Sequence, residues 1–254
     1  GMIGQYLSSL NDGKKLFVQR NVEFPEKWSP LARKIVASKY FFGEQGKPER
    51  EYSAKQLIKR VTGKFEEWAL RQRYFTPEEA SAFANEIAYL TLNQNMSFNS
   101  PVWFNTGIDK IVGEARKEDS REAYIIDSNG CVVNMPRGKE RAYPQTSACF
   151  IQSVDDTMES IMELAKNEAL LFKYGSGTGT NLSTLRSSYE KLSGGGKPSG
   201  PLEYWRFYDR VAGIVKSGGK TRRAAKLDCL DADHPNILEF IVSKKNEEKK
   251  AQIL

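Results

Sequence analysis

The chain has 254 residues, of which 39% are hydrophobic and 28% are charged, the balance of an ordinary globular protein. No run of about 18 uninterrupted apolar residues occurs, so we expect no membrane span and no membrane partner. Three cysteines are too few for a disulfide scaffold, and one histidine excludes a histidine-rich metal site; we expect no metal ligands and a cytoplasmic location. The net charge of +6 fits either phosphate-bearing partners or simple solubility.

The first part of the chain predicts helices. Residues 28–42 carry apolar side chains at three- and four-residue spacing. Ser53 predicts the start of a second helix, and Thr-Pro-Glu-Glu at 76–79 predicts the start of a third. Residues 2–25 are mixed and polar, with one apolar fragment at 16–18, which is typical of an arm. We therefore expect residues 1–98 to form an N-terminal helical domain.

The pattern changes after residue 98. Residues 99–104 are expected to be extended or turn-like, because proline disfavours helix in the residue before it. Asn129-Gly130 predicts a hairpin. From residue 146 strands and helices alternate: strands are expected at 147–154, 180–185 and 224–230, and helices at 155–172, 202–216 and 236–245. Three such units predict parallel strands in an α/β fold, and residues 99–254 then form the first part of a larger domain with an open sheet edge.

Glycines mark two segments that could hold phosphate. Residues 175–179 (GSGTG) could cradle an anion or end a helix, but their spacing and their place after a helix do not match the dinucleotide fingerprint. Residues 217–221 (SGGKT) imitate a P-loop, yet Ile214 stands where the first glycine is required, which rejects that motif. The cations of residues 216–226 form either a phosphate-gripping loop or a solvated basic face. Cys149 lies in a predicted strand, where a lone cysteine is ordinarily a core residue.

Several segments resemble the large catalytic subunit of ribonucleotide reductase. They are FNSPVWFN (98–105), SACFIQSVDD (147–156), KYGSGTGTNLSTLR (173–186), LSGGGKPSGP (192–201), KSGGKTRRAAK (216–226) and HPNILEFIVSKKNEEKKA (234–251). The start, FPEKWSPLARKIVASKYFFG (24–43), resembles the adenosylcobalamin-dependent class II form. The resemblance implies a helical domain followed by the first βα units of a ten-stranded α/β barrel. It also implies the reduction of ribonucleotides to deoxyribonucleotides through a thiyl radical.

The resemblance further implies roles for individual residues. Cys149 matches the first of two cysteines that supply the reducing electrons and become a disulfide. The positions that match substrate-binding residues are Ser100, Ala148 (through its backbone), Cys149 and Gly177. The positions that match residues binding an allosteric deoxynucleotide are Asp156, Thr157 and Arg186. The positions that match the loop relaying effector identity to the substrate site are Gly218, Gly219, Lys220, Arg222 and Arg223.

Other parts of the family pattern match no residue of this chain. They are the radical cysteine, the second redox cysteine, the shuttle cysteines and most cobalamin contacts, so we expect the chain alone to be inactive, as a fragment or one piece of a split enzyme. The implied partners are adenosylcobalamin, a ribonucleotide substrate (by resemblance a diphosphate), a dNTP effector, a thioredoxin-type reductant and a second copy in a homodimer through 157–172 and 202–216; no nucleic acid is expected. The alternative is a stand-alone nucleotide-binding regulatory module, which would not need Cys149.

Overall fold

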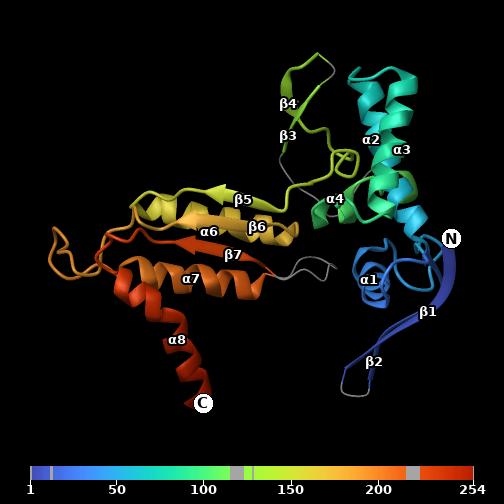
Figure 1. Ribbon diagram of the computed structural model, residues 1–254. Helices are drawn as coiled ribbons and strands as arrows, with labels where there is room; N and C mark the ends of the chain where they lie inside the picture. The colour runs from blue at the N-terminus through green and yellow to red at the C-terminus, as the bar shows by residue number, and fades with distance from the viewer. Residues whose placement is uncertain (1, 12–13, 115–122, 128, 216–223, 254) are drawn as a thin grey trace. The chain divides into compact units, whose positions relative to one another are not determined.

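The computed structural model describes residues 2–11, 14–114, 123–127, 129–215 and 224–253 (Figure 1). The chain forms two compact units, Gly1–Thr146 and Ser147–Leu254. This division differs from the change expected after residue 98. The short helix α4 (Ser100–Asn105) contributes Val102 and Trp103 to the hydrophobic core of the first unit, which ties the chain beyond residue 98 to that unit.

The first unit begins with an antiparallel hairpin at residues 2–25, where we expected an arm in front of a purely helical domain, so the all-helical expectation for this part of the chain was wrong. Strands β1 (Met2–Asn11) and β2 (Lys14–Pro25) pair along their whole length. Val22 and Phe24 are fully buried, so alternate residues of β2 face the core. Polar residues occupy the intervening positions, and this two-residue alternation is the strand signal that overall composition concealed.

The helices predicted in the first unit are confirmed. Helix α1 (Pro30–Ile35) continues into a π-helical turn η1 (Val36–Tyr40), and α2 (Ala54–Arg71) and α3 (Pro77–Leu92) follow. A further short helix, α5 (Asp109–Val112), was not predicted. Ser53 Oγ caps α2 by accepting from Lys55 N. Thr76 and Glu79 form the complete capping box at the start of α3.

Helix α4 contradicts the extended conformation expected for residues 99–104. Asn99 is the extended residue, and the helix begins at Ser100, with Pro101 in the first turn. A proline is tolerated there because the first turn of a helix has no intrahelical acceptors for its N–H groups. The restriction on the residue before proline therefore marks the start of a helix here.

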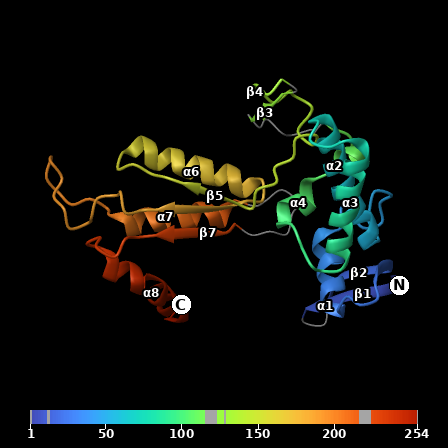
Figure 2. The same cartoon turned by 45° about the horizontal axis from the view of Figure 1, so that its top comes forward.

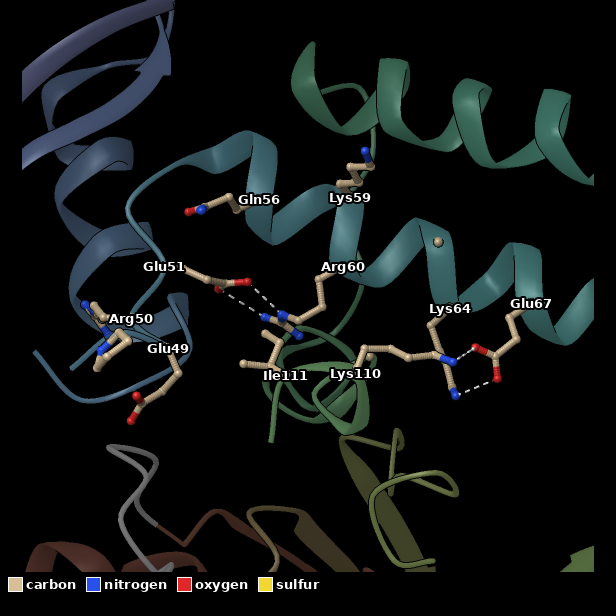
Figure 3. A pocket seen from close by; sticks show the side chains of 13 residues that line it. Glu49, Arg50, Glu51, Gln56, Lys59, Arg60, Lys64, Glu67, Lys110 and Ile111 are labelled. Carbon is tan, nitrogen blue, oxygen red and sulfur yellow. Dashed lines mark hydrogen bonds and ion pairs between the residues drawn. The ribbon is translucent and has the colours of Figure 1, made fainter. Parts of the chain in front are cut away.

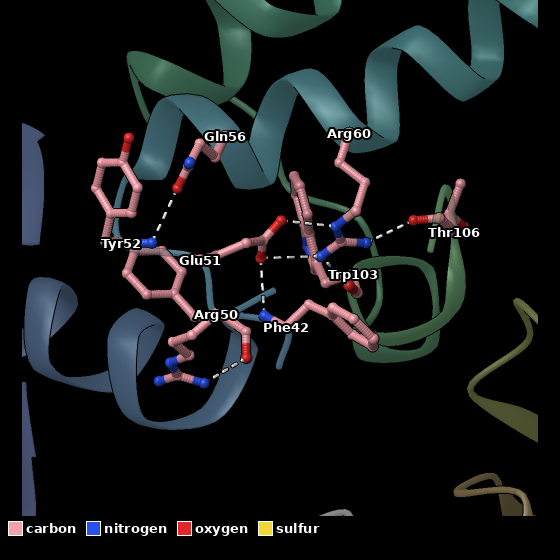
Figure 4. A network of polar contacts seen from close by, with 9 residues as sticks. Phe42, Arg50, Glu51, Tyr52, Gln56, Arg60, Trp103 and Thr106 are labelled. Carbon is pink, nitrogen blue, oxygen red and sulfur yellow. Dashed lines mark hydrogen bonds and ion pairs between the residues drawn. The ribbon is translucent and has the colours of Figure 1, made fainter. Parts of the chain in front are cut away.

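A buried ion pair fixes helix α2 to the chain on both sides of it (Figure 4). Arg60 Nε lies 2.7 Å from Glu51 Oε1, and these two side chains are only 4% and 5% exposed. Glu51 also accepts from Phe42 N at 2.8 Å, and Arg60 donates to Trp103 O at 3.0 Å. Because both charged groups are paired and further hydrogen-bonded, the apolar core tolerates them.

The predicted hairpin around Asn129-Gly130 is confirmed. Strands β3 (Tyr124–Ile126) and β4 (Val132–Asn134) are antiparallel. Gly130 has a φ of +80°, a conformation that favours glycine. Asp127 Oδ1 accepts from Asn129 N and Cys131 N, which fixes the turn.

The second unit is a parallel sheet with helices, as predicted (Figure 2). Its strands β5 (Cys149–Gln152), β6 (Gly177–Asn181) and β7 (Lys226–Cys229) lie in the order β5-β6-β7. Helices α6 (Met158–Lys173) and α7 (Pro201–Ile214) connect them, and α8 (Ile237–Ile253) follows β7. Among the described residues, no helix combines the length and apolar character required to cross a bilayer.

The GSGTG segment has two roles in this unit. Gly175, at φ +87°, ends α6: its N–H donates to Phe172 O, and Ser176 N donates to Leu171 O. This pair of bonds is a Schellman motif, so the helix-ending alternative is correct for Gly175. Gly177 and Gly179 belong to strand β6, which therefore starts earlier than the expected residue 180.

Candidate functional site

Cys149 lies on one face of the sheet, which we call the open face. Parallel register places Cys149 beside Gly177 and Ile151 beside Gly179. Ile151 is 85% exposed, and Leu227 on the same face of β7 is 63% exposed. The opposite face is covered by α6 and α7. Cys149 is therefore an exposed thiol, and its interpretation as a core residue is wrong.

The space around the Cys149 side chain exists because its neighbour on β6, Gly177, has no side chain. A Cβ atom at Gly177 would stand 3.2 Å from Cys149 Sγ and 2.9 Å from Ala225 O. Gly177 N donates to Ala148 O, which joins two of the predicted substrate positions through their backbones. The strand thus presents backbone rather than side chains next to the thiol, and a polar ligand can approach closely there.

Cys229 also lies on the open face but cannot pair with Cys149. Cys149 is level with Gly177, whereas Cys229 is level with Asn181, four residues further along β6. Strand rise and two strand spacings separate the two Cα atoms by about 16 Å. A disulfide requires roughly 4.4–6.8 Å, so any redox partner of Cys149 has to come from another part of the complete protein.

Asp156 and Arg186, two predicted effector residues, form an ion pair. Arg186 Nε lies 2.5 Å from Asp156 Oδ2, with the side chains 46% and 28% exposed. The hydrogen bond to Asp156 raises the pKa of Arg186. Thr157 is the N-cap of α6, where its hydroxyl accepts from Ser160 N at 3.2 Å. The helix expected from residue 155 therefore begins at Met158.

The remaining predicted residues are not described in the second unit with Cys149, Asp156 and Arg186. Ser100 belongs to the first unit, where its hydroxyl lies 3.0 Å from Tyr40 Oη. The predicted specificity-loop residues lie outside the described residues: Gly218, Gly219, Lys220, Arg222 and Arg223.

A buried charged cluster on the covered face was not predicted. Lys226 Nζ forms ion pairs with Glu168 of α6 and with Asp228, the latter at 3.1 Å. Its ammonium group also lies 4.5 Å from the ring centroid of Tyr208 of α7, and Thr178 Oγ1 donates to Glu168 at 3.1 Å. Glu168 is fully buried and the Lys226 side chain is 8% exposed. The alternation of Lys226 and Asp228 along one strand was the available signal.

Burial within this cluster raises the pKa values of two of its groups, Asp228 and Tyr208. Burial raises the pKa of the Asp228 carboxyl, and Lys226 offsets only part of this effect. Burial also raises the pKa of Tyr208, with a further contribution from Glu168. Two buried carboxylates thus share one ammonium group behind the strands that form the open face.

The first unit contains a cavity lined by several cations, but it is poorly suited to bind an anion because carboxylates already pair with them (Figure 3). It has a volume of about 550 Å³ and runs along α2. Several of its cations are already paired: Lys64 Nζ lies 2.7 Å from Asp109 and 2.9 Å from Glu67, and Lys110 Nζ lies 2.9 Å from Glu67. We assign no ligand to it.

The fold and the comparisons define the class of protein. Residues 147–254 match the family model described as ribonucleotide reductase, barrel domain, so the second unit is part of that α/β barrel. Residues 6–94 match the model described as class II vitamin B12-dependent ribonucleotide reductase. The chain belongs to the family of class II vitamin B12-dependent ribonucleotide reductases.

Individual relatives agree with this assignment. The chain is 51% identical over 252 residues to the vitamin B12-dependent ribonucleotide reductase of Rhodopirellula baltica, covering 95% of this chain and 23% of that protein. It is 46% identical to the enzyme of the same name from Streptomyces coelicolor, covering 98% of this chain and 22% of that protein. The alpha subunit of the Actinobacillus ureae class Id ribonucleotide reductase has the same fold, with a TM-score of 0.52, 15% identity, and coverage of 82% of this chain and 29% of that one. The chain thus spans about a quarter of the length of these relatives.

The described residues do not provide a nitrogen ligand for the cobalt of a B12 cofactor. His234, the only histidine, is 8% exposed. Its Nε2 lies 3.0 Å from Leu185 O, and its Nδ1 accepts from Asn236 N at 3.1 Å. Both ring nitrogens are therefore engaged in holding the start of α8, and neither is free to bind cobalt.

Proposed function

We propose that the complete protein containing this chain reduces ribonucleoside diphosphates to deoxyribonucleotides, with Cys149 as one of its two redox thiols. The observation that carries this proposal is the exposed Cys149 thiol beside Gly177 on the open face of a reductase barrel sheet. The diphosphate level comes from the family resemblance. Adenosylcobalamin, when bound, supplies the initiating radical.

The overall reaction balances through the thiols. The C2′–OH bond of the ribose breaks and the oxygen leaves as water, while a C2′–H bond forms. The two electrons come from Cys149 and a second thiol, which lose two protons and become a disulfide. Exchange of this kind needs an accessible sulfur, and the Cys149 thiol is exposed in this chain.

The test uses the complete protein and three variants. Cys149→Ser should abolish multiple turnover with a ribonucleoside diphosphate, adenosylcobalamin and dithiothreitol, while Cys131→Ser and Cys229→Ser should keep it. Cys131 lies in the turn of the β3–β4 hairpin, and Cys229 is too far from Cys149 to form the disulfide. Equal behaviour of the three variants would overturn the role of Cys149. The 254-residue chain alone should form no deoxynucleotide in the same assay.

We also propose that Arg186, Asp156 and Thr157 contribute to a dNTP effector site. The guanidinium group keeps donors that Asp156 does not use, and a planar fork of donors suits phosphate oxygens. Thr157, as the N-cap of α6, would hold the backbone that carries Asp156 in place. Arg186→Ala should weaken dTTP binding by roughly tenfold or more in calorimetric titration of the complete protein, because a charge-assisted contact is lost. Lys166→Ala, an exposed cation of α6, is the control; equal affinities for all three proteins would remove Arg186 from the site.

Two partners complete this proposal. A thioredoxin-type reductant would restore the two thiols after each turnover. A second copy of the protein would pack against α6 and α7, where Met158, Met162 and Ile214 are exposed. Sedimentation of the complete protein tests the dimer: the wild type should sediment as a dimer, and Met162→Glu, which places a charge on this surface, should shift it toward the monomer.

A further inference from the structure

The first unit contains an aromatic cavity that includes none of the residues assigned above to substrate, redox chemistry or effector. It has a volume of about 380 Å³ and lies between α1–η1, α2 and the chain that follows α3. Trp28, Tyr40 and Trp103 contribute aromatic rings, and Leu57 and Ile58 contribute aliphatic side chains. Cavities of this size and lining are typical of small-molecule sites.

The two indole rings are held in place by their own N–H groups. Trp28 Nε1 donates to Leu92 O at 2.8 Å, and Trp103 Nε1 donates to Phe98 O at 3.1 Å. Each ring is only 6% exposed. Because these donors are already used, the tryptophans offer no hydrogen bonds to a ligand and form the floor of the cavity, while Tyr40, which is partly exposed, offers the aromatic surface that favours a flat ligand.

One buried hydroxyl in the lining has no partner. Thr91 is 6% exposed, and its Oγ1 is buried without a hydrogen bond. A buried polar atom that makes no hydrogen bond costs stability, so its presence calls for an explanation. A hydroxyl can either donate or accept, and a ligand with one polar edge would satisfy it.

The rest of the lining points to the same kind of ligand. Gln94 and Asn95 bring exposed amide side chains, which present a donor next to an acceptor as nucleobase edges require. Gln94 has a φ of +59°, unusual for a residue other than glycine. The π-helical turn η1 places Val36 and Tyr40 in the lining, and such turns are frequent at functional sites.

We propose that this cavity binds a planar heteroaromatic ring of nucleobase size, stacked on the aromatic side chains and hydrogen-bonded by Thr91. The ring could belong to a free nucleoside or nucleotide, or to the adenosyl group of the cofactor. All lining residues lie between Trp28 and Trp103, in the first unit. The inference therefore does not rest on the redox role of Cys149, and its test requires no turnover.

The test is a titration of the 254-residue chain with adenosine, followed by tryptophan fluorescence, with ribose as the non-aromatic control. We expect saturable quenching by adenosine and none by ribose. Thr91→Val should weaken binding roughly fivefold, the effect of one neutral hydrogen bond. Thr106→Val is the matched control, because Thr106 Oγ1 is equally buried and unpartnered but outside the cavity. Both variants should keep or raise the melting temperature, which separates a binding effect from misfolding.

Competition then identifies the source of the ring. Displacement of adenosine by ADP indicates a free nucleotide, whereas displacement by adenosylcobalamin but not by hydroxocobalamin indicates the adenosyl group of the cofactor. Either result supports a heteroaromatic site. The proposal is overturned by the absence of saturable quenching at millimolar adenosine, by an equal response to ribose, or by equal losses of affinity in Thr91→Val and Thr106→Val.

Discussion

Removing the ammonium group of Lys226 should destabilise the second unit more than any exposed substitution there. Lys226→Met keeps most of the side-chain volume but leaves Glu168, which is fully buried, without its cation. Breaking one partner of a buried ion pair costs about 3–5 kcal/mol. Because Lys226 pairs with two carboxylates and also lies over the Tyr208 ring, we expect a loss of about 4 kcal/mol in the free energy of unfolding.

A double-mutant cycle checks this reasoning. Lys226→Met with Glu168→Gln removes the stranded charge, and it should recover about 2 kcal/mol relative to the single variant. Lys166→Met is the control: this lysine is 65% exposed and pairs with Glu163, so its loss should cost below about 1 kcal/mol. The assay is native-state hydrogen exchange of the β6 amides, with the α2 amides as an internal reference. A Lys226→Met variant within about 1 kcal/mol of wild type, or a double variant as unstable as the single one, refutes the argument.

Three further outcomes follow from the second unit. Asp228→Asn should raise the melting temperature at neutral pH and not at acidic pH: burial raises the pKa of this carboxyl, so stability is greatest below the unfolded pKa and falls as pH rises through the folded pKa. Gly177→Ala should cost about 1–3 kcal/mol in chemical denaturation, since its Cβ would stand 2.9 Å from a backbone oxygen, whereas Gly63→Ala in α2, with open space around it, should stabilise by about 0.5–1 kcal/mol. Oxidation of the native chain should form no disulfide between Cys149 and Cys229, as peptide mapping by mass spectrometry would show.

Local signals in the sequence predicted most of the elements. The cap at Thr76, the turn at Asn129-Gly130 and the strand–helix alternation after residue 146 each depend on near neighbours, and each is confirmed. The β1–β2 hairpin was missed because the alternation is short: Asn21 and Glu23 flank the buried Val22 and Phe24, but the consecutive apolar residues 16–18 interrupt the pattern. Gly177 and Gly179 were taken for a turn because glycine disfavours strands, and the side chains of Cys149 and Ile151 that need this space belong to another strand.

The candidate site was likewise predicted only in part: individual residues were identified, but contacts between distant residues were not. The family resemblance singled out Cys149, Asp156 and Arg186 one by one, and the structure brings the last two into contact. Their proximity depends on how the chain between them folds back along the sheet. The partners in the Glu168–Lys226 pair could not be predicted for the same reason, since the pair joins helix α6 to strand β7, with β6 and α7 between them in the chain. Ion pairs within a helix, such as Glu163 and Lys166, could be predicted from spacing alone.

The parallel sheet also sets the order in which the chain can fold. Each pairing in it joins strands separated by an entire helix, so the loop between them has to close before any ladder bond forms. Helices α2 and α3, by contrast, are neighbours along the chain, and their caps are made by residues a few positions apart. During synthesis the first unit also emerges first from the ribosome. The first unit can therefore be folded while β5, the strand that carries Cys149, has not yet paired with β6. During that interval the apolar side chains of β5 are exposed to chaperones and to other nascent chains.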